Sequence, residues 1–433
     1  MPEAGRKGGR QKLREELWLP LSFLGAILVG TLLLLLPGVD VDGAVGPLEA
    51  FFTATSAICV TGLIVVDTGS DFTELGQAIV LALIQVGGLG IMTFPAVAMV
   101  VARRRVSLDR ETTLRETFTP IATWSVGRVL FTVFASTFVL EALGFLALRG
   151  ELGDWSALFH TVSAFCNAGF SLYPDSLASQ GPAAVVPIFI LLILGGLGFT
   201  VLLELVRPPW HRRRARVART SLHTRIVLLT SAGLLAVGFV TLLVLERGQP
   251  GHALFMSATA RTAGFETTAT GELTTGSQLA LMPLMFVGGS PGSTAGGIKT
   301  TTLAVLVLLA FASLRNRERP VLFGREIPLG VLRRSFAVLI CSLAVIGLVA
   351  FLLALLEEQR GREFVPVLFE TVSAFGTVGL STGLTADLGT ASKLILCAAM
   401  FVGRVGSLSF FVLLVRAVPP SHVRYPPEEV LVG

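Results

Sequence analysis

The chain has 433 residues, of which 52% are apolar and only 15% charged, and its formal net charge is +5. About a quarter of the residues of an average soluble domain are charged. Residues 75–102, 176–203 and 335–356 contain no charged side chain at all, and each range exceeds the ~20 residues that cross a bilayer. The distribution of charge therefore excludes a soluble protein and predicts a polytopic membrane protein.

Hydropathy, followed along the chain, predicts an all-α membrane protein with eight spans and four shorter apolar stretches. The spans are expected at about 18–39, 75–102, 129–148, 183–206, 226–245, 274–314 with an interruption, 335–356 and 391–417. The shorter stretches lie between the two spans of each pair, at about 46–66, 155–172, 251–265 and 364–382. Each is too short, too polar or too rich in Gly, Ser and Thr to cross a membrane alone.

Basic residues predict the orientation of these spans. Residues 1–14, 103–116, 207–225 and 315–334 hold 23 of the 34 Lys and Arg residues, whereas the intervening segments lean acidic. Basic loops face the cytoplasm, so both termini are expected inside. All four basic blocks lie on one side only if the short stretches enter from outside and return there as re-entrant loops, which is tolerated where they face protein or water.

The four short stretches also form an internal repeat. They align as Ser56–Leu63, Ser163–Phe170, Ala258–Phe265 and Ser373–Leu380, each ending in glycine and a large apolar residue. A second glycine motif begins 25, 26, 24 and 24 residues after the loop glycine, in Val86–Gly90, Leu194–Gly198, Val287–Pro291 and Val402–Gly406. The predicted domains are a cytoplasmic N-terminus (1–15), four parallel pore repeats (16–105, 106–215, 216–318 with a gate loop, 319–418) and a cytoplasmic tail (419–433).

Four such loops around an axis predict a cation pore. Glycine adopts positive φ readily, and rings of backbone carbonyls replace the hydration shell of a permeating cation. The candidate filter residues are Val60, Thr61, Gly62, Asn167, Ala168, Gly169, Thr262, Ala263, Gly264, Thr377, Val378 and Gly379. The alternative is that these glycines only allow close helix packing.

The loops, the spans and the sequence Gly288–Thr302 (GGSPGSTAGGIKTTT) resemble the Trk/Ktr/HKT superfamily of potassium transporters, in particular the KtrB-type membrane subunit of the TrkH family. The resemblance implies potassium uptake across the bacterial inner (plasma) membrane through a gated, channel-like pore, with K+ as permeating ion, Na+ as an activating ion and no organic cofactor in this chain. It also implies a homodimer that carries a cytosolic ring of RCK-type, KtrA-like nucleotide-binding subunits. Plant sodium-selective members have serine where Gly62 stands, so the resemblance favours potassium.

A gate is predicted where the sixth span is interrupted. Residues 288–297 hold five glycines and a proline, which disfavour a continuous helix. In the family that the sequence resembles, the matching stretch obstructs the pore and the matching arginine takes part in gating. The candidate gate residues are Gly288, Gly289, Ser290, Pro291, Gly292, Ser293, Thr294, Ala295, Gly296, Gly297, Lys299 and Arg404. Arg404 is expected to bind loop carbonyls; a snorkelling arginine is the alternative, and Lys299 is as well explained by solvation near the cytoplasm.

Other functional classes fit less well. Gly288–Gly292 matches the G-x-S-x-G pattern of serine hydrolases, but no strand precedes it, and His160 and His252 are expected at the outer starts of short stretches. The four cysteines are far apart, so no disulfide or zinc site is expected. The arginine blocks suggest anionic lipid rather than nucleic acid as partner, and Glu141 and Glu204 are expected at the membrane interfaces without a function. A sodium-coupled or proton-coupled secondary cation transporter remains the alternative to a pore.

Overall fold

The computed structural model describes residues 20–103, 126–206, 220–247, 249–317 and 319–406. The predicted termini (1–15 and 419–433), the first basic block, most of the second and third blocks, and the end of the last predicted span lie outside the described residues.

The described ranges are predominantly α-helical. A first helix covers Pro20–Leu34. It is followed by α2 (Pro47–Cys59), α3 (Glu74–Arg103), α5 (Val126–Leu152), α6 (Asp154–Cys166), α7 (Pro182–Leu197), α8 (Phe199–Val206), α10 (Leu222–Glu246), α11 (Pro250–Thr259), η2 (Thr270–Glu272), α12 (Thr275–Phe286), α13 (Thr300–Leu314), α14 (Leu329–Glu357), η3 (Glu358–Arg360), α15 (Phe364–Gly376), α16 (Leu384–Asp387) and α17 (Thr390–Val405). Strands β1 (Val321–Leu322) and β2 (Arg325–Glu326) form a small antiparallel hairpin between α13 and α14.

Three described helices are long and apolar enough to cross a membrane, namely those over Leu130–Leu152, Leu222–Glu246 and Leu329–Arg360. A fourth candidate is the pair α7 and α8, which is bent by 105°. The apolar segment expected over 183–206 is therefore not one straight helix but two helices with a break between them. The bend lies at Gly198, which follows the last residue of α7 and has a φ of +87°. A Cβ atom on Gly198 would lie 2.7 Å from the carbonyl oxygen of Pro291.

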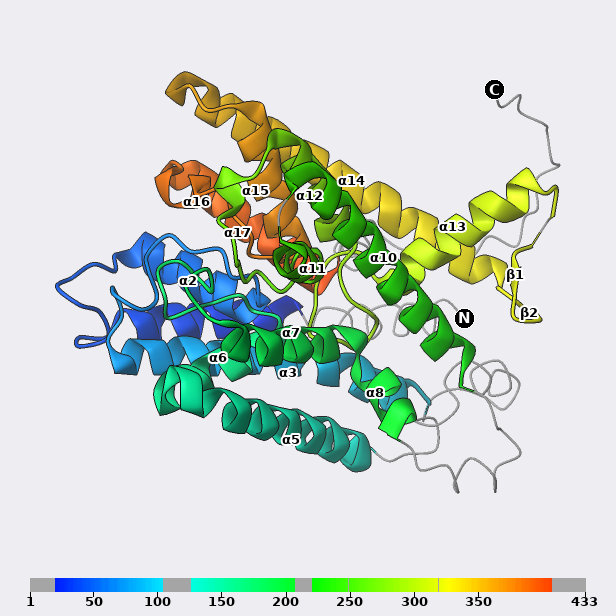
Figure 1. Ribbon diagram of the computed structural model, residues 1–433, viewed down its shortest axis with the longest axis horizontal. Helices are drawn as coiled ribbons and strands as arrows, with labels where there is room; N and C mark the ends of the chain where they lie inside the picture. The colour runs from blue at the N-terminus through cyan, green and yellow to red at the C-terminus, as the bar shows by residue number, and fades with distance from the viewer. Residues whose placement is uncertain (1–19, 104–125, 207–219, 248, 318, 407–433) are drawn as a thin grey trace, which may run out of the picture.

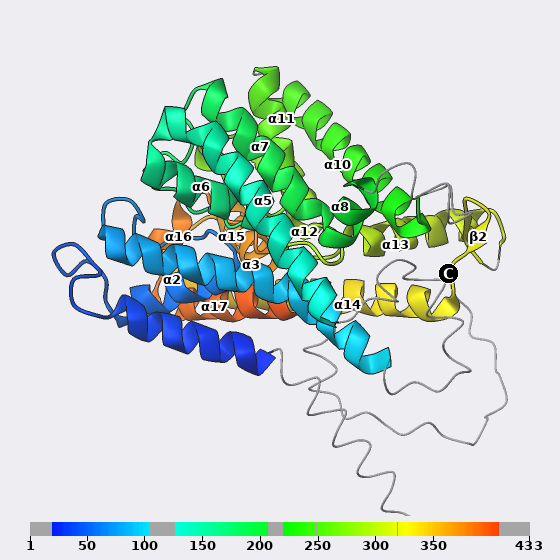
Figure 2. The same cartoon turned by 90° about the horizontal axis from the view of Figure 1, so that it is seen from below.

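The contacts between helices close into a circle. Figures 1 and 2 show these helices from two directions. Four short helices, α2, α6, α11 and α15, lie within the predicted re-entrant stretches. The helix that follows one short helix packs against the next short helix: α3 against α6, α7 against α11, and α12 against α15. The last helix, α17, packs against α2, which brings the two ends of the described chain together.

Buried aromatic and aliphatic residues fix the short helices in this circle. Phe52, Phe159 and Phe369, each ten residues before the loop glycine, are fully buried. The large apolar residue directly after each loop glycine is fully buried as well, and these residues are Leu63, Phe170, Phe265 and Leu380. Burial of a large side chain contributes ~1.5–3 kcal/mol. The first, second and fourth short elements are thus anchored at both ends, whereas in the third the matching residue, Leu254, is 36% exposed and the anchor is Phe265 alone.

Candidate functional site

The four predicted filter segments, residues 60–62, 167–169, 262–264 and 377–379, meet in a closed ring. In every segment the glycine has positive φ, with values of +89°, +71°, +78° and +96°. A Cβ atom on each glycine would collide with a carbonyl oxygen of the next segment along the chain. The distance from such a Cβ to the carbonyl oxygen is 2.4 Å for Gly62 and Ala168, 2.8 Å for Gly169 and Ala263, 2.5 Å for Gly264 and Val378, and 2.2 Å for Gly379 and Thr61. The fourth segment therefore closes on the first.

Each segment carries a second residue in the left-handed conformation, two positions before its glycine. These residues are Val60, Asn167, Thr262 and Thr377, with φ between +50° and +70°. Three of them are β-branched, and such residues rarely adopt positive φ. Strain of this kind persists only where surrounding structure fixes it, and it clusters at functional sites.

Hydroxyl groups of the short helices hold the segments in place. Ser56 Oγ accepts a hydrogen bond from Gly62 N at 3.1 Å, and Ser373 Oγ accepts one from Gly379 N at 3.2 Å. The hydroxyl of Ser163 donates to Phe170 O at 2.8 Å. In the third segment alanine replaces this serine, and Thr259 Oγ1 donates to Phe265 O at 2.7 Å instead. The serine six residues before the glycine is visible in the aligned sequences, but its role was not predicted.

Three threonine hydroxyls of the ring, those of Thr61, Thr262 and Thr377, are buried without a hydrogen-bond partner among the described residues. Buried polar groups are normally satisfied by protein or water. Carbonyl and hydroxyl oxygens are the groups that replace the hydration shell of an alkali cation. The donor set of the ring therefore fits such a cation as cargo.

The second motif requires glycine for a different reason, namely close packing against the preceding short helix. A Cβ on Gly87, Gly195 or Gly403 would lie 2.2, 2.0 or 1.8 Å from a backbone carbonyl oxygen of the preceding short helix. The oxygens belong to Ile58, Phe165 and Phe375, each four residues before its loop glycine. Close helix packing, the alternative considered for the loop glycines, accounts for these glycines of the second motif.

The predicted helix break at residues 288–297 is present. Helix α12 ends at Phe286 and α13 begins at Thr300, and Val287 and Ile298 pair between them as a parallel bridge. The amide of Gly288 donates to Ile298 O at 2.9 Å, and the amide of Thr300 donates to Gly289 O at 3.1 Å. The residues at the two ends of the loop are thus hydrogen-bonded to each other, between the end of α12 and the start of α13.

This loop packs on the second glycine segment of the ring and on the ends of α6 and α7. Ser290 N donates to Gly196 O at 3.0 Å, and Thr294 N donates to Gly195 O at 3.3 Å. The Thr294 hydroxyl donates to Phe165 O at 3.2 Å and lies 3.0 Å from the side-chain amide of Asn167. The loop is therefore in direct contact with a residue of the ring.

Arg404 joins the same loop to a second element. Its Nη1 donates to Thr294 O, and its Nη2 donates to Gly87 O at 3.0 Å. The side chain is only 3% exposed, so it is not a snorkelling arginine. Lys299 is half-buried, and its Nζ donates to Ala295 O at 2.7 Å. The contact expected between Arg404 and a loop carbonyl is thus present, and both cations bind the loop backbone.

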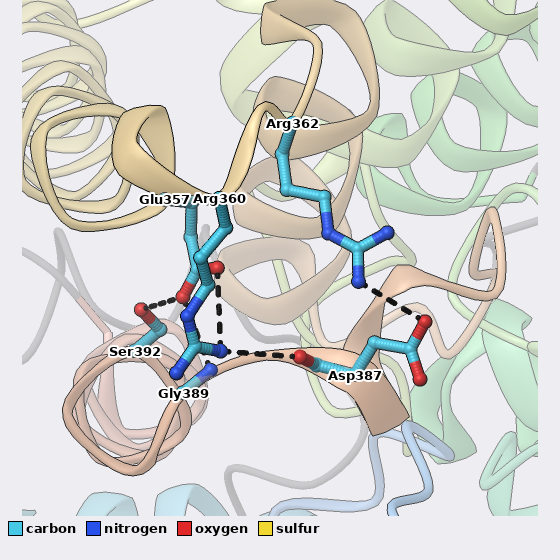
Figure 3. Close-up of polar contacts among 6 residues, drawn as sticks. All are labelled: Glu357, Arg360, Arg362, Asp387, Gly389 and Ser392. Carbon is cyan, nitrogen blue, oxygen red and sulfur yellow. Dashed lines mark hydrogen bonds and ion pairs between the residues drawn. The ribbon is translucent and has the colours of Figure 1, made fainter.

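A polar cluster at the far end of α17 holds that helix (Figure 3). Glu357, at the end of α14 and 1% exposed, accepts hydrogen bonds from Gly389 N at 3.1 Å and Ser392 Oγ at 2.5 Å. Arg360 lies 3.7 Å from Glu357 Oε2 and donates to Asp387 O at 3.4 Å. A carboxylate at a helix N-terminus is favourable. Glu357 therefore caps the helix whose other end carries Arg404.

The structure also shows the partners of other side chains considered in the sequence analysis. Ser290 Oγ contacts Thr300 Oγ1 at 3.0 Å. His160 is fully buried within α6, not at an outer end, and contacts Ser171 Oγ at 3.0 Å. Glu204 accepts hydrogen bonds from Ser221 N at 2.6 Å and Ser221 Oγ at 2.7 Å, so it supports the start of α10. All four cysteines are free, and in the described ranges no group of three potential metal ligands occurs.

Comparison with known proteins places this architecture in a family. Residues 31–423 match the TrkH family, described as cation transport proteins. The chain is 36% identical to Ktr system potassium uptake protein B of Bacillus subtilis (96% of each chain) and 37% identical to the protein of the same name from Vibrio alginolyticus (99% of this chain, 96% of the other). It is 33% identical to potassium/sodium uptake protein NtpJ of Enterococcus hirae (99% of each chain).

The fold is shared with the crystal structure of the potassium transporter TrkH from Vibrio parahaemolyticus, with a TM-score of 0.74 at 18% identity over 92% of this chain and 84% of the other. The family and these relatives are transporters rather than enzymes, and the apolar helices agree with a multi-pass membrane protein. The chain belongs to the TrkH family of cation transport proteins.

Proposed function

We propose that this chain is the ion-translocating subunit of a Ktr/Trk-type system and carries K+ across the bacterial plasma membrane through the ring of four glycine segments. The observation that carries the proposal is the closed ring, in which each glycine contacts the next segment in chain order. The printed names of the relatives, which describe potassium uptake proteins, support potassium as the cargo.

The proposed selectivity filter comprises residues 60–62, 167–169, 262–264 and 377–379, whose carbonyls would coordinate the ion. The proposed layout has eight spans and four re-entrant loops in repeats over 16–105, 106–215, 216–318 and 319–418, with both termini cytoplasmic. The positions of the basic blocks in the sequence support this orientation.

The proposed gate comprises residues 288–297 together with Lys299 and Arg404. The loop's contacts with Asn167 and with Gly195 and Gly196 support a barrier next to the filter. Arg404 adds a buried positive charge bound to the loop backbone, which opposes cation passage while the loop is in this position.

The filter is tested by replacing Gly62 with serine. The new Cβ would lie 2.4 Å from Ala168 O at a φ of +89°, so the ring must distort. We expect weaker discrimination of potassium from sodium, measured as sodium competition with potassium uptake in a transport-deficient bacterium. The matched control is Gly90→Ser, because the nearest atom to a Cβ at Gly90 is 3.7 Å away. Unchanged sodium competition in Gly62→Ser at normal expression contradicts a filter at Gly62.

Two further parts of the proposal concern ions and partners. A homodimer carrying a cytosolic ring of nucleotide-binding, RCK-type subunits is proposed, with Na+ as activating ion. The name of the Enterococcus relative, a potassium/sodium uptake protein, keeps sodium coupling as a second candidate function. Flux into liposomes under a voltage clamp separates the two: ohmic current indicates a pore, and saturating flux that requires sodium indicates a coupled carrier.

A further inference from the structure

A pocket of about 450 Å³ lies between α3, α5 and α6, and its lining includes no residue of the glycine ring or of the 288–297 loop. Its lining is apolar except for two side chains. The lining residues are Ala78, Leu81, Ala82, Gln85, Phe138, Glu141, Ala142, Phe145, Leu158 and Val162. Phe138 is 54% exposed and Leu158 39% exposed, so the pocket opens on an apolar surface of the kind that faces lipid.

Glu141 is one of the two polar side chains of this pocket. It is in the middle of α5 and only 6% exposed. Its Oε2 accepts a hydrogen bond from Gln85 Nε2 at 3.2 Å, whereas its Oε1 has no hydrogen-bond partner among the described residues. A buried carboxyl group with an open acceptor is costly, and within a membrane it marks a functional site by default.

The partner that Glu141 lacks is a hydrogen-bond donor, and a positively charged donor would also neutralise the carboxylate. The described residues that line the pocket include no basic side chain, so the protein around it does not supply one. The volume falls within the ~300–1,000 Å³ of small-molecule sites, which combine apolar walls with a few polar groups. These are the properties of a site for an apolar body with a single cationic head.

We propose that the pocket between α3, α5 and α6 binds a cationic amphiphile, a molecule with a hydrocarbon chain or ring and one ammonium group, whose ammonium pairs with Glu141 and whose apolar part lies against Phe138, Phe145 and Leu158. The ligand reaches the pocket laterally, from the membrane.

One lining residue of the pocket contacts the residue next to the ring. Gln85, which donates a hydrogen bond to Glu141, accepts one from Cys166 Sγ at 3.5 Å. Cys166 is the last residue of α6, and the next residue, Asn167, belongs to the second filter segment. Binding of the amphiphile does not depend on the ring being a potassium filter, so the proposal stands or falls separately from the proposed function.

Trp155 provides a local reporter of binding. Its Nε1 donates to Gln77 Oε1 at 2.7 Å, directly beside Ala78 of the pocket, and it lies one helical turn before Leu158. The chain has four tryptophans. Replacement of Trp18, Trp124 and Trp210 by phenylalanine therefore makes Trp155 the sole tryptophan of the full-length protein in lipid nanodiscs.

The experiment titrates this protein with a long-chain primary amine brominated at its tail, and in parallel with the alcohol of the same length and bromination. We expect saturable quenching of Trp155 fluorescence by the amine, with about tenfold weaker binding of the alcohol. Glu141→Gln should weaken amine binding to the level of the alcohol. Glu151→Gln, which removes an exposed carboxylate from the same helix, is the matched control and should leave amine binding unchanged.

A second variant keeps the proposal testable if Glu141→Gln does not fold. Ala82 is exposed at the pocket wall, so Ala82→Phe fills the pocket without disturbing the core, and it should abolish saturable quenching by the amine. The proposal is overturned if the amine and the alcohol quench equally in the wild type. It is also overturned if quenching is unsaturable, or if it survives both Glu141→Gln and Ala82→Phe.

Discussion

Helices α3, α7 and α17 on one side, and the interrupted segment between α12 and α13 on the other, use the first glycine of the second motif in different ways. In α3, α7 and α17 the first glycine of the second motif packs against a carbonyl of the preceding short helix. The corresponding Gly288 instead packs against its own loop, because a Cβ there would lie 2.0 Å from Gly296 O. The aligned motif is thus the same in sequence, but its contact is interhelical in three places and within the loop in one.

The difference shows how one unit can acquire a loop that the others lack. Where the glycine packs on a neighbouring helix, the helix continues or bends with its hydrogen bonds largely retained. At residues 288–297 the helical bonds are absent, and the freed backbone groups bind Gly195, Gly196 and Arg404. Since buried backbone groups must be satisfied, these contacts across the circle are what make the interruption stable in an apolar environment.

The strongest test of this comparison removes the loop. Deleting residues 290–294 takes away Ser290 and Thr294, and with them the backbone contacts to α7 and to Arg404. If the loop is a barrier of a few kcal/mol, basal potassium uptake should rise on the order of a hundredfold, or ~2.7 kcal/mol. Uptake is measured in a transport-deficient bacterium and normalised to inserted protein. Loss of flux in a folded, inserted variant would show that the loop forms part of the conduction path.

The interhelical role of the glycine is tested by two adjacent residues. Gly195→Ala places a Cβ 2.0 Å from Phe165 O, whereas Gly196→Ala places one 3.7 Å from its nearest neighbour, Asn167. Overpacking costs ~1–3 kcal/mol, so we expect Gly195→Ala to unfold at a clearly lower temperature in detergent and Gly196→Ala to resemble the wild type. Equal melting temperatures for the two variants would mean that the close approach is not required.

Arg404→Ala tests how much the arginine that binds the loop contributes to the barrier. The variant removes the bonds to Thr294 O and Gly87 O, and a charge-assisted hydrogen bond contributes ~1.5–3 kcal/mol. We expect basal flux to rise about tenfold. Arg404→Lys keeps the charge but lacks the planar guanidinium group. Its basal flux should lie between that of the wild type and that of Arg404→Ala. Combined with the loop deletion, Arg404→Ala should add little, because the two changes remove one contact; fully additive gains would indicate two separate gates.

The smallest expected effect is at the N-terminal end of α17. Glu357→Gln removes the buried carboxylate that accepts from Gly389 N and Ser392 Oγ, and it should lower the free energy of unfolding by ~1–2 kcal/mol. Glu326→Gln is the control, since Glu326 pairs with Arg319 at the exposed hairpin, where such pairs contribute ~0–1 kcal/mol. Thermal unfolding in detergent measures both. A larger loss for Glu326→Gln would contradict the capping role of Glu357.

The amino-acid sequence by itself determined the apolar segments, the fourfold glycine pattern and the break at residues 288–297. These features follow from local properties: hydropathy over about 20 residues, the freedom of glycine at positive φ, and the cost of glycine and proline within a helix. The short helices and the glycine segments that follow them accordingly lie where the alignment of the four stretches predicts them.

Only the tertiary structure decided which groups meet across the circle. Gly198, at the bend between α7 and α8, packs against the 288–297 loop, Glu357 caps a helix that begins 33 residues later, and Arg404 binds both Thr294 and Gly87. Packing of α3 and α6 against α5 buries Glu141, which the sequence did not predict. Each of these outcomes depends on contacts between elements distant in the chain, whereas periodicity and composition report only which face of an element is apolar.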